Sequence, residues 1–198
     1  DEVIIGSTQW GALYGNDVKT GKMLWSKSQD GLGFRASSPA IKDGLLYLIS
    51  DKAFFIMDAK KGDIIVRKDL PYSVDATSTP VISENEIIFG TSRDGLVALD
   101  RSTLNEKWHC PVGKALIYTS SYTRPDSQTI ETSPIIVENT VFVGASDGYL
   151  YAVDKNKGSI TAKYDLGAPI FSSVSFSGNT LFVSDFGGNV YAFCMKSK

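Results

Sequence analysis

The chain has 198 residues, of which 42% are hydrophobic and 21% charged, and this composition excludes a disordered protein. With 20 basic and 22 acidic side chains its formal net charge is −2, so no basic surplus exists for binding nucleic acid. No apolar run approaches the ~20 residues of a transmembrane helix, and two cysteines are too few for a disulfide scaffold.

Two landmarks recur along the sequence. The first is a Ser/Thr-Pro pair followed by two apolar residues, found at Pro39, Pro80 and Pro134 and, in degenerate form, at Val174, with spacings of 41, 54 and 40 residues. The second is an apolar segment ending in Asp, found at Asp17, Asp58, Asp100 and Asp154, with Cys194 in the fifth position, at spacings of 41, 42, 54 and 40 residues. Because both landmarks share one period and one long interval, they predict a repeat protein.

Each repeat predicts four short antiparallel strands in a fixed order. In the second repeat, a first strand at residues 38–41 precedes an apolar strand at residues 45–49. A third strand, such as residues 149–153, follows an Asp-Gly type of turn, and a fourth strand contains Trp25 or Trp108 in two of the repeats. No segment has helical periodicity over three turns. Four short strands per ~40 residues are typical of a β-propeller blade.

We therefore expect an all-β propeller built of five repeats, at approximately residues 1–30, 31–71, 72–113, 114–168 and 169–198. The first repeat lacks a first strand and the last lacks a fourth strand, which makes 18 strands in total. The two incomplete repeats hold six strands and cannot merge into one four-stranded blade. Two arrangements stay open: a five-bladed ring with two three-stranded blades, or an arc of a larger ring, which would leave blade faces and strand edges to be covered.

The turn after each landmark Asp has a glycine signature. Gly21, Gly62 and Gly158 stand four residues after the Asp, where a left-handed backbone conformation is expected. The third repeat has Leu104-Asn105 instead, and we expect Asn105 to provide this conformation. Trp25 and Trp108 are expected to pack against the turn and strand of their own blades, near the outer rim.

The segments 17–25 and 147–154 closely resemble the repeat of quinoprotein-like β-propellers, with its Asp-Gly-x-Leu-Tyr-Ala-Leu-Asp and Thr-Gly-x-x-x-Trp pattern. The resemblance covers essentially the whole chain and implies a propeller, commonly with seven or eight blades. The family includes quinone-dependent alcohol dehydrogenases, a lipoprotein of outer-membrane protein assembly, and propellers fused to catalytic domains. The resemblance also implies an extracytoplasmic location, in the periplasm or at the cell surface.

A dehydrogenase of this family would hold pyrroloquinoline quinone and calcium at the ring axis over a Trp, beneath a disulfide between adjacent cysteines. Here Cys110 and Cys194 are 84 positions apart, and we expect no disulfide between them. Trp10, Trp25 and Trp108 fall in a turn or in fourth strands. We therefore expect neither the quinone nor calcium.

Other chemistry-bearing residues have simpler explanations. His109 is the only histidine, and its neighbour Cys110 points to the opposite face of a strand, so the two cannot share a metal. Asp94, Asp147 and Asp185 are explained by tight turns. We expect no catalytic and no metal-binding residue.

The long interval of the repeat is the best functional candidate. Between Pro111 and Ser133 the repeat gains about a dozen residues. In a propeller, connections from a fourth strand to the next first strand share one face with the turns between second and third strands, and Tyr and Arg are enriched at binding hot spots. The predicted ligand- or partner-binding face contains Arg35, Tyr72, Tyr118, Tyr122, Arg124 and Phe171. The alternative is a solvated insertion whose tyrosines cover the blade edges.

These observations favour a non-catalytic propeller that binds a protein partner or supports an attached catalytic domain. The remaining blades would come from the rest of a longer chain or from oligomerisation. The alternative function is the propeller of a quinone-dependent dehydrogenase, or an accessory domain fused to a hydrolase such as a metallophosphoesterase.

Overall fold

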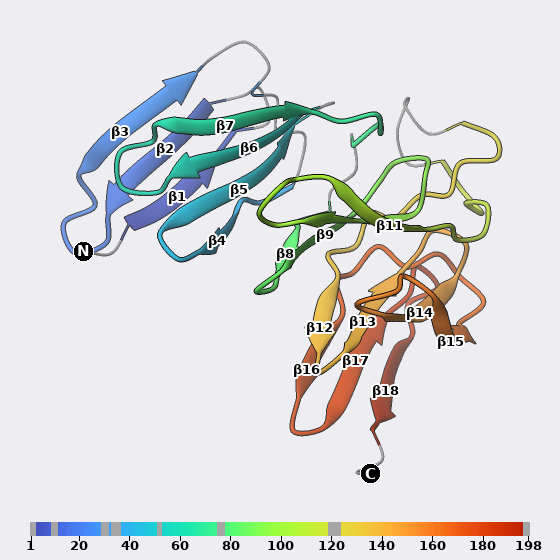
Figure 1. Cartoon of the computed structure of the whole chain (residues 1–198). Helices are drawn as coiled ribbons and strands as arrows, with labels where there is room; N and C mark the ends of the chain where they lie inside the picture. The colour runs from blue at the N-terminus through green and yellow to red at the C-terminus, as the bar shows by residue number, and fades with distance from the viewer. Residues whose placement is uncertain are drawn as a thin grey trace.

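The computed structural model describes residues 3–8, 12–28, 32, 37–50, 53–74, 78–118 and 124–195, which form 18 β-strands in five antiparallel sheets and contain no helix. We call the sheets blades 1 to 5 in chain order (Figure 1). Each blade is a meander in which consecutive strands pair. The predicted all-β class and the predicted order of strands, with three in the first and last blades and four in the others, are confirmed.

The strand bounds follow the repeat. Blade 1 contains β1 (Val3–Ser7), β2 (Ala12–Asp17) and β3 (Met23–Ser28). Blade 2 contains β4 (Ala40–Lys42), β5 (Leu45–Ser50), β6 (Ala53–Asp58) and β7 (Ile64–Asp69). Blade 3 contains β8 (Val81–Ile82), β9 (Glu86–Gly90), β10 (Leu96–Asp100) and β11 (Glu106–Cys110). Blade 4 contains β12 (Ile135–Val137), β13 (Thr140–Gly144), β14 (Tyr149–Asp154) and β15 (Ile160–Asp165). Blade 5 contains β16 (Ser175–Ser177), β17 (Thr180–Ser184) and β18 (Val190–Cys194).

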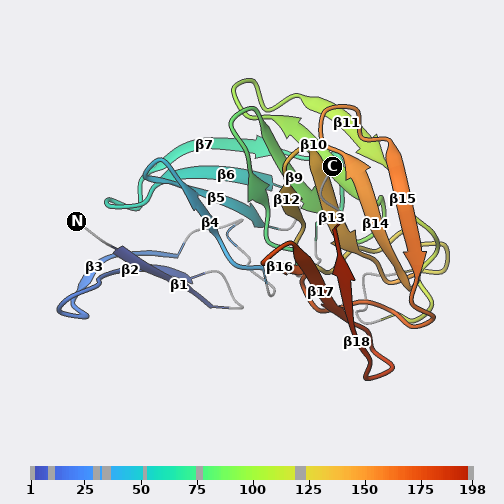
Figure 2. The same cartoon turned by 90° about the horizontal axis from the view of Figure 1, so that it is seen from below.

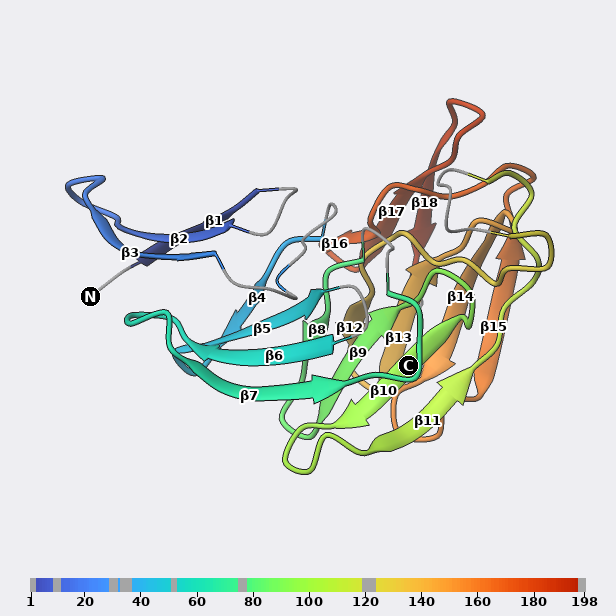
Figure 3. The same cartoon turned by 90° about the horizontal axis from the view of Figure 1, so that it is seen from above.

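The blades follow one another along a curved path, with the first strands on the inner side and the fourth strands on the outer side (Figures 2 and 3). The inner strands of neighbouring blades approach each other, as β4 and β8 do. Blade 1 and blade 5 lie at the two ends of this path (Figure 3).

The Ser/Thr-Pro landmark forms a hydrogen-bonded ladder along the inner side. The N–H of Ser38 donates to Thr79 Oγ1 over 3.1 Å, and the N–H of Thr79 donates to Ser133 Oγ over 3.0 Å. The N–H of Ser133 donates in turn to Ser173 Oγ over 3.1 Å. Each bond joins one blade to the next, so the hydroxyl group of the motif has a structural purpose that explains why Ser or Thr recurs there.

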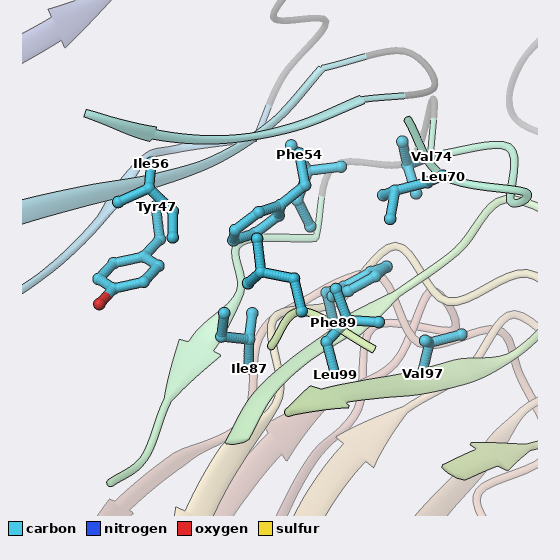
Figure 4. Close-up of a cluster of buried hydrophobic side chains, with 11 residues drawn as sticks. Tyr47, Phe54, Ile56, Leu70, Val74, Ile87, Phe89, Val97 and Leu99 are labelled. Carbon is cyan, nitrogen blue, oxygen red and sulfur yellow. The ribbon is translucent and has the colours of Figure 1, made fainter. Parts of the chain in front are cut away.

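The core lies between the blades. The second and third strands are buried on both faces because a neighbouring sheet covers each side, as the continuous burial of β9 shows. Figure 4 shows Tyr47 and Phe54 of blade 2 directed toward Ile87, Phe89 and Leu99 of blade 3. This packing buries large apolar side chains from both sheets, so blade-to-blade contact stabilises the fold.

Each buried tryptophan joins its blade to the following one. The Trp25 indole N–H donates to the carbonyl oxygen of Ala59 over 3.1 Å, and a Cβ added at Gly62 would lie 2.5 Å from the ring. Trp25 also covers Gly15 of its own blade, where a Cβ would lie 2.3 Å from the ring. We expected each tryptophan to pack against the strand and the turn of its own blade. Trp25 does cover its own blade at Gly15, but the turn that it packs against belongs to the next blade, because an outer strand also faces the neighbouring sheet.

The landmark Asp closes the turn after each third strand. The carboxylate of Asp100 accepts hydrogen bonds from the N–H groups of Ser102 and Thr103 over 3.0 and 2.8 Å. Together with the bond from the Ser102 hydroxyl, these bonds lower the pKa of Asp100 to about 2. The left-handed residue here is Leu104, with φ of 58°, and the expectation for Asn105 is wrong. The turn requires this conformation four residues after the Asp, and Leu104 is buried in the core between blades 2 and 3.

Candidate functional site

One face of the molecule is built from connections that lie against the turns of the next blade. The same backbone hydrogen bond recurs three times: Ser92 N–H to Ser73 O (2.9 Å), Ser146 N–H to Thr129 O (3.0 Å) and Phe186 N–H to Pro169 O (2.8 Å). In each pair the donor is in a turn between second and third strands, and the acceptor is in a connection between a fourth strand and the next first strand. These bonds place both kinds of segment on one face, which we call the connection face.

The described part of the long insertion is built into this face. The N–H of Gln128 donates to Arg93 O, and Gln128 O accepts from the N–H of Gly95 over 2.8 Å. Within the insertion, the N–H of Ala115 donates to Ser127 O over 2.8 Å. The bonds of Gln128 anchor one side of the insertion to the turn of blade 3, and the bond between Ala115 and Ser127 ties its two sides together, so its base is a structured part of the propeller.

Asp147 is the hub of this anchoring. Its side chain is buried and accepts hydrogen bonds from the N–H of Gly113 over 2.7 Å and from the Tyr151 hydroxyl over 2.6 Å. A third bond comes from the N–H of Tyr149 over 3.1 Å. Burial and the bond to Asp147 raise the pKa of Tyr151. Asp147 therefore does more than form its own turn, since it holds the start of the insertion.

The equivalent turn of blade 5 contains a similar arrangement around Asp185. This carboxylate accepts from the N–H of Asn189 over 2.9 Å and from the Tyr191 hydroxyl over 3.0 Å. The hydrogen bonds from Asn189 lower the pKa of Asp185. Both carboxylates thus accept a hydrogen bond from a backbone N–H close by in the sequence and another from the hydroxyl of a tyrosine in the following strand.

The predicted site residues that the structure describes are distributed over three successive connections. Tyr72 is half-buried, donates its hydroxyl hydrogen to Glu106 and has its ring centroid 6.1 Å from that of His109. Burial, followed by the bond to Glu106, raises the pKa of Tyr72. This side chain therefore lies against the outer strand of blade 3.

The other candidates are more exposed. Tyr118 is 52% exposed, and the Arg124 side chain is exposed while its backbone pairs with Ser127. Phe171 is half-buried and packs edge-on against Phe186 with centroids 5.4 Å apart. Arg35 and Tyr122 lie outside the described residues.

Two further residues of this surface were not identified from the sequence. Leu116 is 56% and Ile117 37% exposed, and together with Tyr118 they form three consecutive exposed apolar residues. The N–H of Leu116 donates to Ser146 O over 2.9 Å, which fixes the start of this segment on blade 4. The signal that could have identified these residues is the apolar run Leu-Ile-Tyr, which lies in an insertion that contains neither landmark of the repeat.

The described residues do not fit a quinone and calcium site. They contain no group of three or more His, Cys, Asp or Glu side chains that could hold a metal ion. Trp25 and Trp108 lie between blades on outer strands and so provide no axial floor. Cys110 is buried and Cys194 exposed, and both are free thiols. Burial raises the pKa of Cys110 to about 11. Within the described part of the chain, no helix is long and apolar enough to cross a membrane.

These blades, with their Asp-closed turns and interblade tryptophans, define a β-propeller of the pyrroloquinoline-quinone-like repeat class. The sequence profile described as outer membrane protein assembly factor BamB matches residues 9–197, and the chain belongs to this family. It is 26% identical over 193 residues to the assembly factor BamB of Legionella pneumophila strain Paris, a match that covers 92% of this chain and 46% of that protein.

Solved structures share the fold. BamB from Moraxella catarrhalis superposes with a TM-score of 0.73 at 20% identity, covering 96% of this chain and 57% of that one. The quinohemoprotein alcohol dehydrogenase ADHIIG from Pseudomonas putida HK5 superposes with a TM-score of 0.70 at 14% identity, covering 96% and 38%. The chain spans about half the length of the curated relatives it matches.

Proposed function

We propose that this chain is a non-catalytic propeller scaffold that binds a protein partner in the assembly of outer membrane proteins, outside the cytoplasm. Its membership in the BamB family supports this function, because the relatives' name assigns them to that process. The proposed partner surface is the connection face, with Arg35, Tyr72, Tyr118, Tyr122, Arg124 and Phe171 as predicted and with Leu116 and Ile117 added.

One observation carries the proposal. Leu116, Ile117 and Tyr118 expose apolar side chains next to one another on a segment whose backbone is bonded to blade 4. Contiguous exposed apolar residues on a rigid base are typical of interaction surfaces. A partner that covers them would gain apolar burial without having to order this segment first.

The dehydrogenase alternative receives no support from the described residues. The likeness to the alcohol dehydrogenase is a likeness of fold, and fold alone does not define function. On the inner side of blades 2 to 5, the hydroxyls and backbone N–H groups of the ladder bond to one another. We therefore propose that the chain needs no quinone and no calcium.

We further propose that the chain is an arc of a larger propeller. The inner ladder runs from Ser38 to Ser173, and in the same pattern it would continue to a first strand of blade 1 at one end and to a blade after blade 5 at the other. Both end blades expose large apolar side chains, among them Ile4 at 55% and Val190 at 76%. Further blades would bury these faces in the same way as the blades described here bury one another.

Site-specific photo-crosslinking at Tyr118 in cells of the source organism tests the proposed function. We expect a crosslink to a protein of the outer-membrane assembly process, and its loss when Leu116 and Ile117 are both replaced by Ser. A crosslinker at Ile65, which is 56% exposed on the outer strand β7, is the matched control. If position 118 captures nothing beyond the position 65 control, or if the captured proteins are cytoplasmic enzymes, the proposal is wrong.

Alanine at Tyr118, Tyr122 and Arg124 supplies the stability control. We expect each loss to be about 0.5 kcal/mol, as for surface substitutions. If the triple variant unfolds, the insertion is a structural brace and the partner-binding role assigned to these three side chains fails.

A further inference from the structure

Three positions come together where an outer strand packs on the next blade, and we call them a docking triplet. The first lies on the third strand, two residues before the landmark Asp, and the second lies opposite to it on the fourth strand of the same blade. The third lies in the turn of the next blade, four residues after the landmark Asp of that blade. In chain order the triplets that the structure describes are Gly15–Trp25–Gly62, Ile56–Val66–Leu104 and Ala98–Trp108–Gly158.

The first and third triplets place a large ring against small residues. A Cβ added at Gly15 would lie 2.3 Å from the Trp25 ring, and a Cβ added at Gly62 would lie 2.5 Å from the same ring. Trp108 covers Gly158 in the same way, and a Cβ added there would lie 2.6 Å from the ring. The indole therefore occupies the space that larger side chains at the other positions would need.

The triplet between blades 2 and 3 has the opposite distribution of size. Val66 stands in place of the indole, whereas Ile56 and Leu104 stand where the other triplets have glycine or alanine. Ile56 and Leu104 are 7% and 6% exposed, and Val66 packs against the cluster of buried side chains to which both belong. Three side chains of medium size thus occupy a place that is elsewhere filled by one ring beside small residues.

Neighbouring contacts show that the outer strands of blades 1 and 2 dock in the same register. Two residues beyond the second triplet position, a lysine ammonium donates to the side chain five residues after the landmark Asp of the next blade. These bonds run from Lys27 to Asp63 Oδ1 over 3.5 Å and from Lys68 to Asn105 Oδ1 over 3.3 Å. The two interfaces therefore differ in the side chains of their triplets and not in the alignment of their strands.

Leu104 occupies a turn position that favours glycine. Its N–H donates to Asp100 O over 2.8 Å, and the N–H groups of Gly62 and Gly158 make the same bond to their own landmark residues. The φ of Leu104 is 58°, in the left-handed region that is unfavourable for a branched side chain. Strained residues persist where the surrounding structure requires them. Here the requirement is steric, because the buried Leu104 side chain belongs to the cluster against which Val66 packs.

We propose that the docking triplets select, by side-chain size, which outer strand can pack on which blade. Blades 2 and 4 present glycine in the turn and accept an indole, whereas blade 3 presents Leu104, accepts Val66 and rejects an indole. Blade 3 therefore does not accept the Trp25 strand of blade 1 in place of the outer strand of blade 2, which excludes one swapped order of similar repeats. The selection acts at interfaces between blades 1 and 4 and is independent of the proposed partner surface.

The effect of one substitution in two backgrounds of the intact chain tests the proposal. Val66→Trp in the parent should lower the melting temperature by about 2–12 °C, because the added ring overlaps Ile56 and Leu104. In the background Ile56→Ala/Leu104→Gly, which has the small residues of the triplet between blades 3 and 4, Val66→Trp should raise the melting temperature, because the ring fills the vacated space. Thermal unfolding followed by circular dichroism measures both changes. The proposal is overturned if Val66→Trp fails to lower the melting temperature of the parent or fails to raise that of the background.

Hydrogen exchange of the indole N–H groups locates the added ring. When the three substitutions are combined, the new indole should donate to the carbonyl oxygen of Arg101, which corresponds to the acceptors Ala59 and Lys155 of the other two interfaces. We therefore expect an additional slowly exchanging indole N–H by NMR in the triple variant, and none in Val66→Trp alone. Rapid exchange of the new indole N–H in the triple variant would overturn the proposal, because the ring would then lie outside the interface.

Ile65→Trp is the matched control, because it adds an indole at the neighbouring position, which is 56% exposed. It should change the melting temperature by the same amount in both backgrounds. If Ile56→Ala/Leu104→Gly does not fold by itself, Val66→Trp should restore folding and Ile65→Trp should not. Failure of Val66→Trp to restore folding, or restoration by both substitutions, would overturn the proposal.

Discussion

The indole N–H of Trp108 donates to the backbone carbonyl oxygen of Lys155 over 2.8 Å, across 47 positions of sequence. This bond joins the outer strand of blade 3 to the turn of blade 4, and the ring covers Gly158 in the same turn. A bulky side chain of one blade thus packs on a glycine of the next, and blades 1 and 2 repeat the arrangement with Trp25 and Gly62. Stability therefore depends on the fit between neighbouring repeats.

Replacement of Trp108 by Ala should destabilise the chain by about 3–5 kcal/mol, because it removes a nearly buried ring and leaves a cavity between two blades. The midpoint of urea unfolding measures the effect. Ile65→Ala, at a half-exposed position on the equivalent strand of blade 2, should change the free energy of unfolding by less than about 1 kcal/mol. Equal midpoints for the Trp108 variant and the parent would contradict the interblade role.

Gly62 and Gly21 form a matched pair for testing the glycine contact. Both have a left-handed backbone, with φ of 71° and 69°. A Cβ added at Gly62 would lie 2.5 Å from the Trp25 ring, whereas a Cβ added at Gly21 would meet no atom of another part of the chain within 4 Å. Gly21→Ala should cost about 1–2 kcal/mol, from backbone strain alone. Gly62→Ala should cost about 1–3 kcal/mol more than Gly21→Ala, because the Trp25 ring must also move. Chemical denaturation of both variants gives the difference, and similar losses would show that the ring yields freely.

Asp147→Ala should loosen the insertion. It removes the acceptor of the Tyr151 hydroxyl and the shorter of the two hydrogen bonds of the Gly113 N–H, which keeps only its 3.2 Å bond to the Tyr151 oxygen. The loss of a buried partner costs about 1–3 kcal/mol. Amide hydrogen exchange at Gly113 should accelerate more than exchange in β9, which lies outside the affected region. Asp63→Ala, at a solvent-exposed carboxylate, is the control. Unchanged protection at Gly113 would contradict the hub role of Asp147.

The buried carboxylate of Glu86 should make the folded chain less stable in acid. Burial raises the pKa of this carboxyl, but the Lys107 ammonium at 2.6 Å and the Ser83 hydroxyl outweigh it and hold the pKa below the ordinary value of 4.5. Because the folded-state pKa lies below the unfolded one, the contribution of Glu86 is present above pH 4.5 and is lost as the pH falls through the folded-state pKa.

The variant Glu86→Gln measures how much the charge of Glu86 contributes to the free energy of unfolding. It should be less stable than the parent at pH 7, by about 1–3 kcal/mol because the ammonium loses its charged acceptor. The difference should shrink as the pH falls below 4.5 and through the lower pKa of the folded state, where the parent also loses the carboxylate. Unfolding midpoints at pH 7, 5 and 3 provide the measurement. A difference that is independent of pH would show that Glu86 acts through its shape and not through its charge.

The sequence by itself determined the blades. Strand length, apolar content and the Asp and Gly turn residues are local properties, and their recurrence with one period predicted the strand order from β1 to β18 without any knowledge of packing. It also identified Tyr118, Arg124 and Phe171 as residues of the connections. The exposure of Leu116 and Ile117 was not predicted, because an apolar residue in a chain of buried strands does not by itself indicate an exposed position.

Only the tertiary structure decided how the repeats meet. In the turn of blade 3 the left-handed residue is Leu104, because the position four residues after the Asp must adopt this conformation even though Asn105 tolerates it better. Trp25 bonds to a blade that begins after its own repeat ends, and Asp147 bonds to Gly113 across 34 positions. A cavity of about 610 Å³, lined by Phe142 and Ala152 of blade 4 and by Leu181 and Phe193 of blade 5, is left between these two sheets. Such features depend on which distant side chains share one space, and the local pattern of a repeat carries no information about the volume left between its neighbours.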